Sequence, residues 1–189
     1  VALDSTYVEA WSRLARARAT LYFLSTPTPA GAEAARQAAE RALTLAPDRP
    51  EGHSARAAYE RFVTGNMPRA FSEDSVAVAM APTDASLLSD LGGPEMSLGR
   101  WDAARTHLEL AARLDPRSAR AQRALGLLLG ATRHYPEARA ALDRGRALAP
   151  TNLVGVLWRT MVELAEGDLA AARAFVAATP KEVAPPDLV

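Results

Sequence analysis

Three histidines are the first residues to consider as chemical groups, because imidazole is both a metal ligand and an acid–base catalyst near neutral pH. They are His53, His107 and His134, and their positions differ by 54 and 27 (107 − 53 and 134 − 107). No two have the i, i+4 spacing of a helical metal site, and no glutamate completes an HExxH motif. The sequence therefore predicts no metal site.

The sequence also lacks the motifs of catalytic nucleophiles and of phosphate-binding loops. The chain has no cysteine, which excludes disulfides, thiolate metal ligands and a cysteine nucleophile. It contains no GxSxG, P-loop or GxGxxG motif, and the pair Gly92-Gly93 is followed by Pro94, which does not make a phosphate cradle. We expect no catalytic residue, no cofactor and no enzymatic activity in this chain.

The distribution of charged side chains is compatible with a binding surface. The chain has 22 basic and 22 acidic residues, so its net charge is zero, which argues against general nucleic-acid binding. Between Arg113 and Arg146, however, eight arginines stand against three acidic residues. Two interpretations stay open. The arginines form a solvated helix face, or they form a basic patch around Arg120 and Arg123 that faces an acidic peptide or a neighbouring molecule.

The elements that must position these side chains repeat along the sequence. Four similar tripeptides are Ala46-Pro47-Asp48, Ala81-Pro82-Thr83, Asp115-Pro116-Arg117 and Ala149-Pro150-Thr151. The positions of their prolines differ by 35, 34 and 34 (82 − 47, 116 − 82 and 150 − 116). A period of about 34 residues is typical of solenoids built from helix–turn–helix units, in which each unit buries its apolar face against its neighbours. The sequence thus predicts an all-α fold.

A second set of residues keeps the same period and predicts the turn inside each helix pair. Gly65, Gly99 and Gly167 occupy one slot of the repeat, and Arg133 takes that slot in the remaining unit. Glycine adopts a positive φ easily and therefore ends helices. A bulky apolar residue follows each slot by two positions. In the third unit this residue is Trp101, and we expect it to pack against both helices of its pair.

The unit formed by residues 85–118 resembles a tetratricopeptide repeat. It carries the residues and motifs Leu88, Leu91, Gly92, Gly99-Arg100-Trp101, Ala104, Ala111 and Leu114-Asp115-Pro116. The resemblance extends over nearly the whole chain. It implies a right-handed α-solenoid, also called an α-α superhelix, whose first helices line a concave groove that binds a peptide or protein partner.

The resemblance also carries candidate binding residues onto this sequence. Besides the residues named below, its repeat frame places seven others in the groove, namely Glu9, Ser12, Ala55, Val63, Ser89, Gly93 and Leu157. The partner-binding residues predicted in this way are Arg16, Tyr59, Phe62, Met96, Arg120, Arg123, Leu127 and Met161. For Tyr59, Phe62 and Met96 an alternative stays open, because apolar residues at helical spacing most often pack between helices.

We expect the repeats to cover residues 8–49, 51–84, 85–118, 119–152 and 153–178, with residues 1–7 as the tail of a preceding repeat and 179–189 as a C-terminal tail. Both ends are expected to be cut from a larger protein. The first repeat has eight extra residues and a predicted loop at Ser25–Gly31, where prolines break the helical pattern. Pro94 falls within an expected helix, where it either kinks or ends the helix, or frees carbonyl groups for a partner.

These observations predict a protein-interaction scaffold with no cofactor, no nucleic-acid partner and no direct membrane insertion. Residues 46–53 and 149–153 resemble repeat arrays attached to bacterial serine/threonine kinases and nucleotide cyclases, which implies a sensory or scaffolding part of a signalling protein. The alternatives are a structural module that self-associates through open repeat ends, and a non-catalytic region of a larger enzyme. The compartment is not determined. The cytoplasm is favoured, and an extracytoplasmic location fits an array tethered to a membrane-anchored kinase or cyclase.

Overall fold

The computed structural model describes residues 6–25 and 27–180, and the described residues contain helices and turns but no β-strand. The helices are α1 (Val8–Leu24), α2 (Pro29–Leu45), α3 (Pro50–Tyr59), the π-helical turn η1 (Glu60–Thr64), α4 (Met67–Met80), α5 (Ala85–Ser97), α6 (Trp101–Leu114), α7 (Ala119–Ala131), α8 (Tyr135–Leu148), α9 (Leu153–Glu166) and α10 (Leu169–Ala177). The chain forms two compact units, residues 1–100 and 101–189, here called the N-terminal and C-terminal units.

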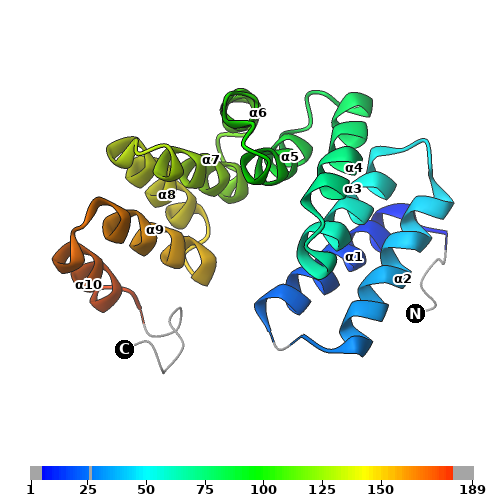
Figure 1. Cartoon of the computed structure of the whole chain (residues 1–189), viewed down its shortest axis with the longest axis horizontal. Helices are drawn as coiled ribbons and strands as arrows, with labels where there is room; N and C mark the ends of the chain where they lie inside the picture. The colour runs from blue at the N-terminus through cyan, green and yellow to red at the C-terminus, as the bar shows by residue number, and fades with distance from the viewer. Residues whose placement is uncertain (1–5, 26, 181–189) are drawn as a thin grey trace. The chain divides into compact units, whose positions relative to one another are not determined.

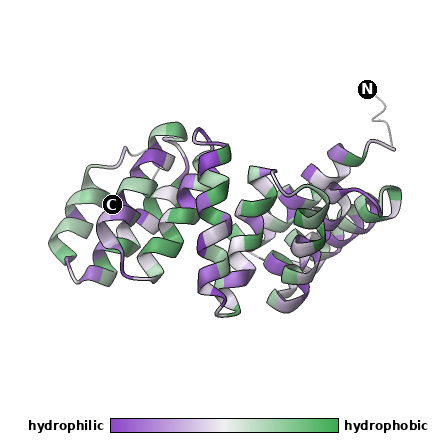
Figure 2. Cartoon of the chain, turned by 90° about the horizontal axis from the view of Figure 1, so that it is seen from above, coloured by the Kyte–Doolittle hydropathy of each residue, from purple (hydrophilic) through white to green (hydrophobic). Residues whose placement is uncertain are grey.

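Consecutive helices pack as antiparallel pairs within each unit, as Figure 1 shows. In the N-terminal unit α1 packs against α2, and α3 packs against α1, α2 and α4. In the C-terminal unit α7 packs against α8, while α9 packs against α8, α7 and α10. Hydrophobic and hydrophilic residues alternate along these helices (Figure 2), as expected of helices that bury one face. The all-α repeat fold predicted from the sequence is confirmed.

Alanine dominates the core of the N-terminal unit. Ala15 of α1, Ala39 of α2 and Ala55 of α3 belong to one buried cluster, and each is fully buried. Side chains this small let helix backbones approach closely. Larger residues, including Trp11 and Tyr59, pack against the edge of this cluster. The C-terminal unit contains a comparable cluster of Ala138, Leu142 and Val162.

All four predicted turn slots have a left-handed backbone. The φ angles are 68° at Gly65, 72° at Gly99, 92° at Gly167 and 63° at Arg133. The three glycines adopt this conformation without a steric penalty, whereas a side chain at Arg133 strains it. The predicted breaks between the two helices of a pair are therefore confirmed, with Arg133 tolerated in a position that favours glycine.

The longer interval between Pro47 and Pro82 contains one extra residue, which a π-helical turn absorbs. From the proline to the turn slot the numbering advances by 18 in this unit (65 − 47) and by 17 in the next (99 − 82). The extra residue thus belongs to the first helix of the pair, where η1 spans Glu60–Thr64. A π turn accommodates an insertion of this kind without breaking the helix.

Three local expectations need correction. The loop expected at Ser25–Gly31 is shorter, because α2 begins at Pro29 and the hydroxyl of Thr28 accepts a hydrogen bond from the Gly31 N–H at 3.1 Å; Thr26 lies outside the described residues. Proline fits the first turn of a helix, where its missing N–H has no partner to lose. Of the alternatives given for Pro94 only the early helix end is wrong, because α5 continues past this buried proline to Ser97. Trp101 is 43% exposed rather than a fully packed anchor.

Candidate functional site

The N-terminal unit has an open pocket of about 400 Å³ on its surface. Its lining comes from α1, α3 and the start of α5, which are the first helices of three successive pairs. The lining residues are Glu9, Ser12, Arg13, Arg16, Pro50, Glu51, Ser54, Asp84, Ser86 and Leu87. The lining thus combines both signs of charge with three serines, of which Ser12 and Ser54 are buried and Ser86 is exposed.

Helical periodicity explains why α1 supplies four of these residues. Glu9, Ser12, Arg13 and Arg16 have the spacing i, i+3, i+4 and i+7, which places them on one face of the helix. Ser12 is also buried and lies three and seven residues before the core residues Ala15 and Ala19, so the pocket face of α1 adjoins the core on the side of Ser12. The start of α5 is fixed by Asp84, whose carboxylate accepts hydrogen bonds from the backbone N–H groups of Ser86 and Leu87 at 2.8 and 3.1 Å. This is an N-terminal cap.

Arg16 connects the pocket to the interior of the unit. Its guanidinium lies 3.1 Å from the Asp90 carboxylate of α5 and donates a hydrogen bond of 3.4 Å to the hydroxyl of Ser54. Burial lowers the pKa of Arg16, although an arginine keeps its charge throughout the physiological range. The three side chains hold α1, α3 and α5 together behind the pocket.

Asp90 is shared with a second arginine. Arg61, in η1, lies 3.2 Å from Asp90 and also pairs with Asp74 of α4. Asp74 is 1% exposed, and burial raises its pKa to about 6 despite the lowering effect of Arg61. Two arginines and two aspartates from four elements therefore form one buried ionic network, which we call the Asp90 network.

A salt bridge at the edge of the pocket orders two of its acidic residues. Arg49, which precedes α3, lies 2.5 Å from Glu9 of α1 and 2.9 Å from Glu51 of α3. The hydrogen bond from Arg49 lowers the pKa of Glu9, and the same bond raises the pKa of Arg49. Arg49 therefore holds both carboxylates in place at the edge of the pocket.

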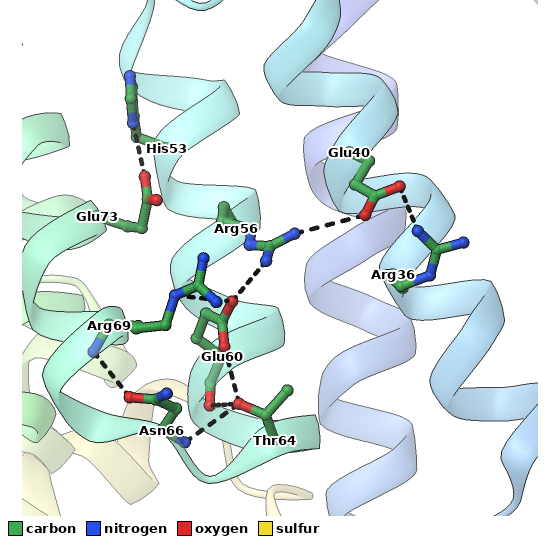
Figure 3. A network of polar contacts seen from close by, with 9 residues as sticks. All are labelled: Arg36, Glu40, His53, Arg56, Glu60, Thr64, Asn66, Arg69 and Glu73. Atoms are coloured by element: carbon green, nitrogen blue, oxygen red, sulfur yellow. Dashed lines mark hydrogen bonds and ion pairs between the residues drawn. The ribbon is translucent and has the colours of Figure 1, made fainter.

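A separate polar cluster surrounds Glu60 at the start of η1 (Figure 3). The Glu60 carboxylate lies 2.7 Å from the Arg56 guanidinium and accepts a hydrogen bond of 2.9 Å from the Thr64 hydroxyl. Glu60 is 2% exposed, so these partners compensate a charge that is almost fully removed from water. The cluster stabilises the π turn and is separate from the pocket, since none of its three residues lines it.

His53 has a structural environment in the same view. One ring nitrogen lies 2.8 Å from the Glu73 carboxylate (Figure 3). The other lies 3.0 Å from the Pro47 carbonyl oxygen, which the figure does not draw. Each ring nitrogen therefore already has a protein partner. Among residues 6–25 and 27–180, no group of three or more metal-ligating side chains comes together.

The structure places the predicted groove residues in different environments. Arg16 lines the pocket, together with the predicted Glu9 and Ser12. Tyr59 and Phe62 are half-buried and pack against core clusters, and the Phe62 ring lies 5.4 Å from that of Phe23. These two side chains therefore have the inter-helix packing that the alternative interpretation describes.

The other candidates lie outside this pocket. Met96 is a half-buried residue of α5, and Met161 of α9 is 46% exposed. Arg120, Arg123 and Leu127 are half-buried residues of α7 and share one face through their i, i+3 and i+7 spacing. Burial lowers the pKa of Arg123. A role of these five residues in binding stays a prediction.

Sequence reasoning missed several lining residues. Arg13 lies two residues before the buried Ala15 and three before Arg16. The helical spacing of the charged residues on α1 therefore indicates that Arg13 lies on the same face as Arg16. Ser54 and Ser86 carry no comparable signal, because a small hydroxyl residue has no preferred side of a helix. Their position in the pocket depends on how α3 and α5 are rotated against α1.

Membrane insertion finds no support among the helices that the structure describes, since none of them combines the length and apolar character needed to span a bilayer.

Comparison with known proteins identifies the fold of the chain. No family model and no curated protein matches the sequence. The solved structures that resemble the chain include TTC0263 from Thermus thermophilus, a tetratricopeptide-repeat protein, with 25% sequence identity and a TM-score of 0.77 over 94% of this chain and 93% of that one.

Two further structures are more distant. PilF of Pseudomonas aeruginosa has 19% identity and a TM-score of 0.64 over 90% of this chain and 75% of that one. YrrB, described as a tetratricopeptide-repeat protein with an unusual peptide-binding site, has 14% identity and a TM-score of 0.58 over 98% of this chain and 91% of that one. The helix pairs, their turns and these similarities together show that the chain has the helical repeat fold of tetratricopeptide-repeat proteins.

Proposed function

We propose that this chain is a protein-interaction scaffold and that the pocket of the N-terminal unit receives an extended segment of its partner. The observation that carries the proposal is the composition of the lining. Three helices that are not consecutive in the sequence, α1, α3 and α5, direct polar side chains toward one open surface.

The lining suits the chemistry of a peptide. The hydroxyl of the exposed Ser86 is able to donate to and accept from the amides of a backbone, whereas Ser12 and Ser54 are buried and Ser54 already accepts from Arg16. Arg13 is exposed and available to a carboxylate of the partner, whereas Arg16 is held by Asp90. The buried ion pairs behind the pocket fix its geometry before a partner arrives, which reduces the entropy lost on binding.

Two comparisons support a binding role. Tetratricopeptide folds resemble this chain over most of its length, and YrrB is described as having a peptide-binding site. The three structures named above are not described as parts of kinases or cyclases. The signalling role therefore stays a prediction from the sequence resemblance, as do self-assembly and attachment to a catalytic domain.

A peptide library displayed on phage and selected against the purified chain tests the proposal. Ser86→Trp places an indole in the pocket at an exposed position of α5, so we expect selected peptides to bind this variant at least tenfold more weakly. Ser72→Trp, at an exposed position of α4 outside the pocket, is the matched control. Selected peptides that bind both variants like the unmodified chain would place the binding site elsewhere.

A further inference from the structure

The C-terminal unit presents a second, apolar pocket of about 390 Å³ between α9 and α10. Its lining includes Leu164, Leu169, Ala172 and Val176, with Arg173 at its edge. Leu164 is 44% exposed and Leu169 is 51% exposed. Exposed aliphatic residues gathered in one hollow typically mark an interaction surface.

The repeat period relates this pocket to an interface that is already formed in the same unit. Ala172 and Val176 lie one period after Ala138 and Leu142 (172 − 138 and 176 − 142 both equal 34). Ala138 and Leu142 form a buried cluster with Val162 of α9. The side of α10 that faces the pocket is thus the counterpart of the side of α8 on which α9 lies.

Two further positions of the pocket have counterparts that contact α9. Leu169 lies one period after Tyr135, and the Tyr135 hydroxyl donates a hydrogen bond of 3.1 Å to the Ala165 carbonyl. Leu164 lies one period after Gly130, at which an added Cβ would lie 3.1 Å from the Val162 side chain. The pocket therefore repeats the α9-binding surface with more apolar side chains, and no helix occupies it among the described residues.

The arginine in the lining of the pocket indicates the charge of a helix that would fit there. Arg173 lies one period after Arg139 (173 − 139 = 34). Arg139 lies 3.2 Å from Glu163 of α9 and also pairs with Glu166. Arg173 is exposed at the corresponding place. A helix that resembles α9 would pair an acidic side chain with Arg173 and bury an aliphatic side chain in the pocket.

From this continuity we infer that the α9–α10 face binds an amphipathic helix of a partner protein, one that carries an aliphatic residue followed directly by an acidic residue and by a second acidic residue three positions later. This is the pattern of Val162, Glu163 and Glu166 in α9. The surface is distinct from the pocket of the N-terminal unit, and the inference does not rest on the function proposed for that pocket.

A labelled synthetic peptide with the sequence of α9, Leu153–Glu166, is the probe, and fluorescence anisotropy with the full chain measures its binding. We expect saturable binding that Leu164→Gln and Leu169→Gln each weaken about tenfold, because loss of one buried aliphatic side chain costs about that factor. Both residues are exposed, so these variants are expected to fold. Circular dichroism and thermal unfolding check this.

Charge reversal tests the predicted ion pair. Arg173→Glu should weaken the peptide about two- to fivefold, the range of a surface salt bridge, and a peptide with its Glu163 replaced by arginine should recover that loss on this variant. Arg113→Glu, at an exposed arginine of α6, is the matched control and should change nothing.

Three results would overturn the inference. The first is absence of peptide binding to the folded chain. The second is binding that is indifferent to Leu164→Gln, Leu169→Gln and Arg173→Glu, which would mean that the peptide replaces α9 on α8. The third is a chain that does not bind the peptide but forms a dimer, with the dimer lost in these variants. The occupant of the pocket would then be a second copy of the chain.

Discussion

Arg61 in the π turn η1 and Asp74 in α4 form an ion pair in which both side chains are almost fully buried, with 10% and 1% of their surfaces exposed. The pair joins two helices of one repeat, and through Asp90 it extends to α5. A buried charge pair of this kind is costly to desolvate and costly to disrupt. We therefore expect the free energy of unfolding to depend on the protonation of Asp74 and on substitutions in the Asp90 network.

Stability should depend on the protonation of Asp74. Burial raises the pKa of Asp74 to about 6 in the folded chain, against about 4 for an unfolded aspartate. Between pH 4 and 6 the folded state therefore binds the proton more tightly, so the free energy of unfolding contributed by this group falls as the pH rises, by about 3 kcal/mol in total. Arg61, Arg16 and Glu73 are the charged groups that act on it.

Urea unfolding of the unmodified chain and of Asp74→Asn between pH 4 and 7 measures this contribution. Asparagine does not titrate, so the difference in unfolding free energy between the two proteins should change with pH across this window. A constant difference would show that Asp74 has the same pKa in the folded and unfolded chains.

Removal of Asp90 should destabilise the chain strongly. Asp90→Ala leaves the half-buried Arg16 without its carboxylate and the buried Arg61 with Asp74 alone, and breaking a buried ion pair costs about 3–5 kcal/mol. Asp48→Ala, at an exposed turn position, is the control and should change the free energy of unfolding by less than about 0.5 kcal/mol. Similar values for the two variants in denaturant unfolding would contradict a structural role of the Asp90 network.

Glycine at position 133 should stabilise the chain. Arg133 has a φ of 63°, a left-handed conformation that costs a residue with a side chain about 1–2 kcal/mol. Arg133→Gly relieves this strain and should raise the free energy of unfolding by about 1 kcal/mol. The gain is smaller than the full strain energy because glycine also makes the unfolded chain more flexible. The same change at Arg113, in the last turn of α6, should instead lower it. Equal signs for both variants would refute the strain at Arg133.

Gly126 should not tolerate a methyl group. A Cβ at this position of α7 would lie 2.6 Å from Cγ of Leu142 and 3.2 Å from the carbonyl oxygen of Ala138. Gly126→Ala therefore forces α7 and α8 apart and should cost about 1–3 kcal/mol. Gly155→Ala in α9 meets no neighbouring atom within 4 Å and should stabilise by about 0.5 kcal/mol. Thermal unfolding distinguishes the two, and a stabilised Gly126→Ala would show that α7 and α8 adjust freely.

The sequence by itself determined the helix pairs and their turns. Proline and glycine act on the backbone of their own neighbourhood, so the intervals around Pro82, Pro116 and Gly99 were sufficient to place breaks that the structure confirms. Even the single extra residue before Gly65 is visible in the spacing. Its accommodation as a π turn was not, because that depends on whether Glu60 and Arg61 find partners inside the fold.

The tertiary structure decided which side chains share a surface. Arg16, Arg61, Asp74 and Asp90 are far apart in the sequence and meet because α1, η1, α4 and α5 pack around one interior. The pocket likewise depends on how α1, α3 and α5 are rotated against one another, which small core residues such as Ala15 and Ala55 permit in many arrangements. Helical periodicity defines the faces of each helix separately, and only packing selects the faces that come together.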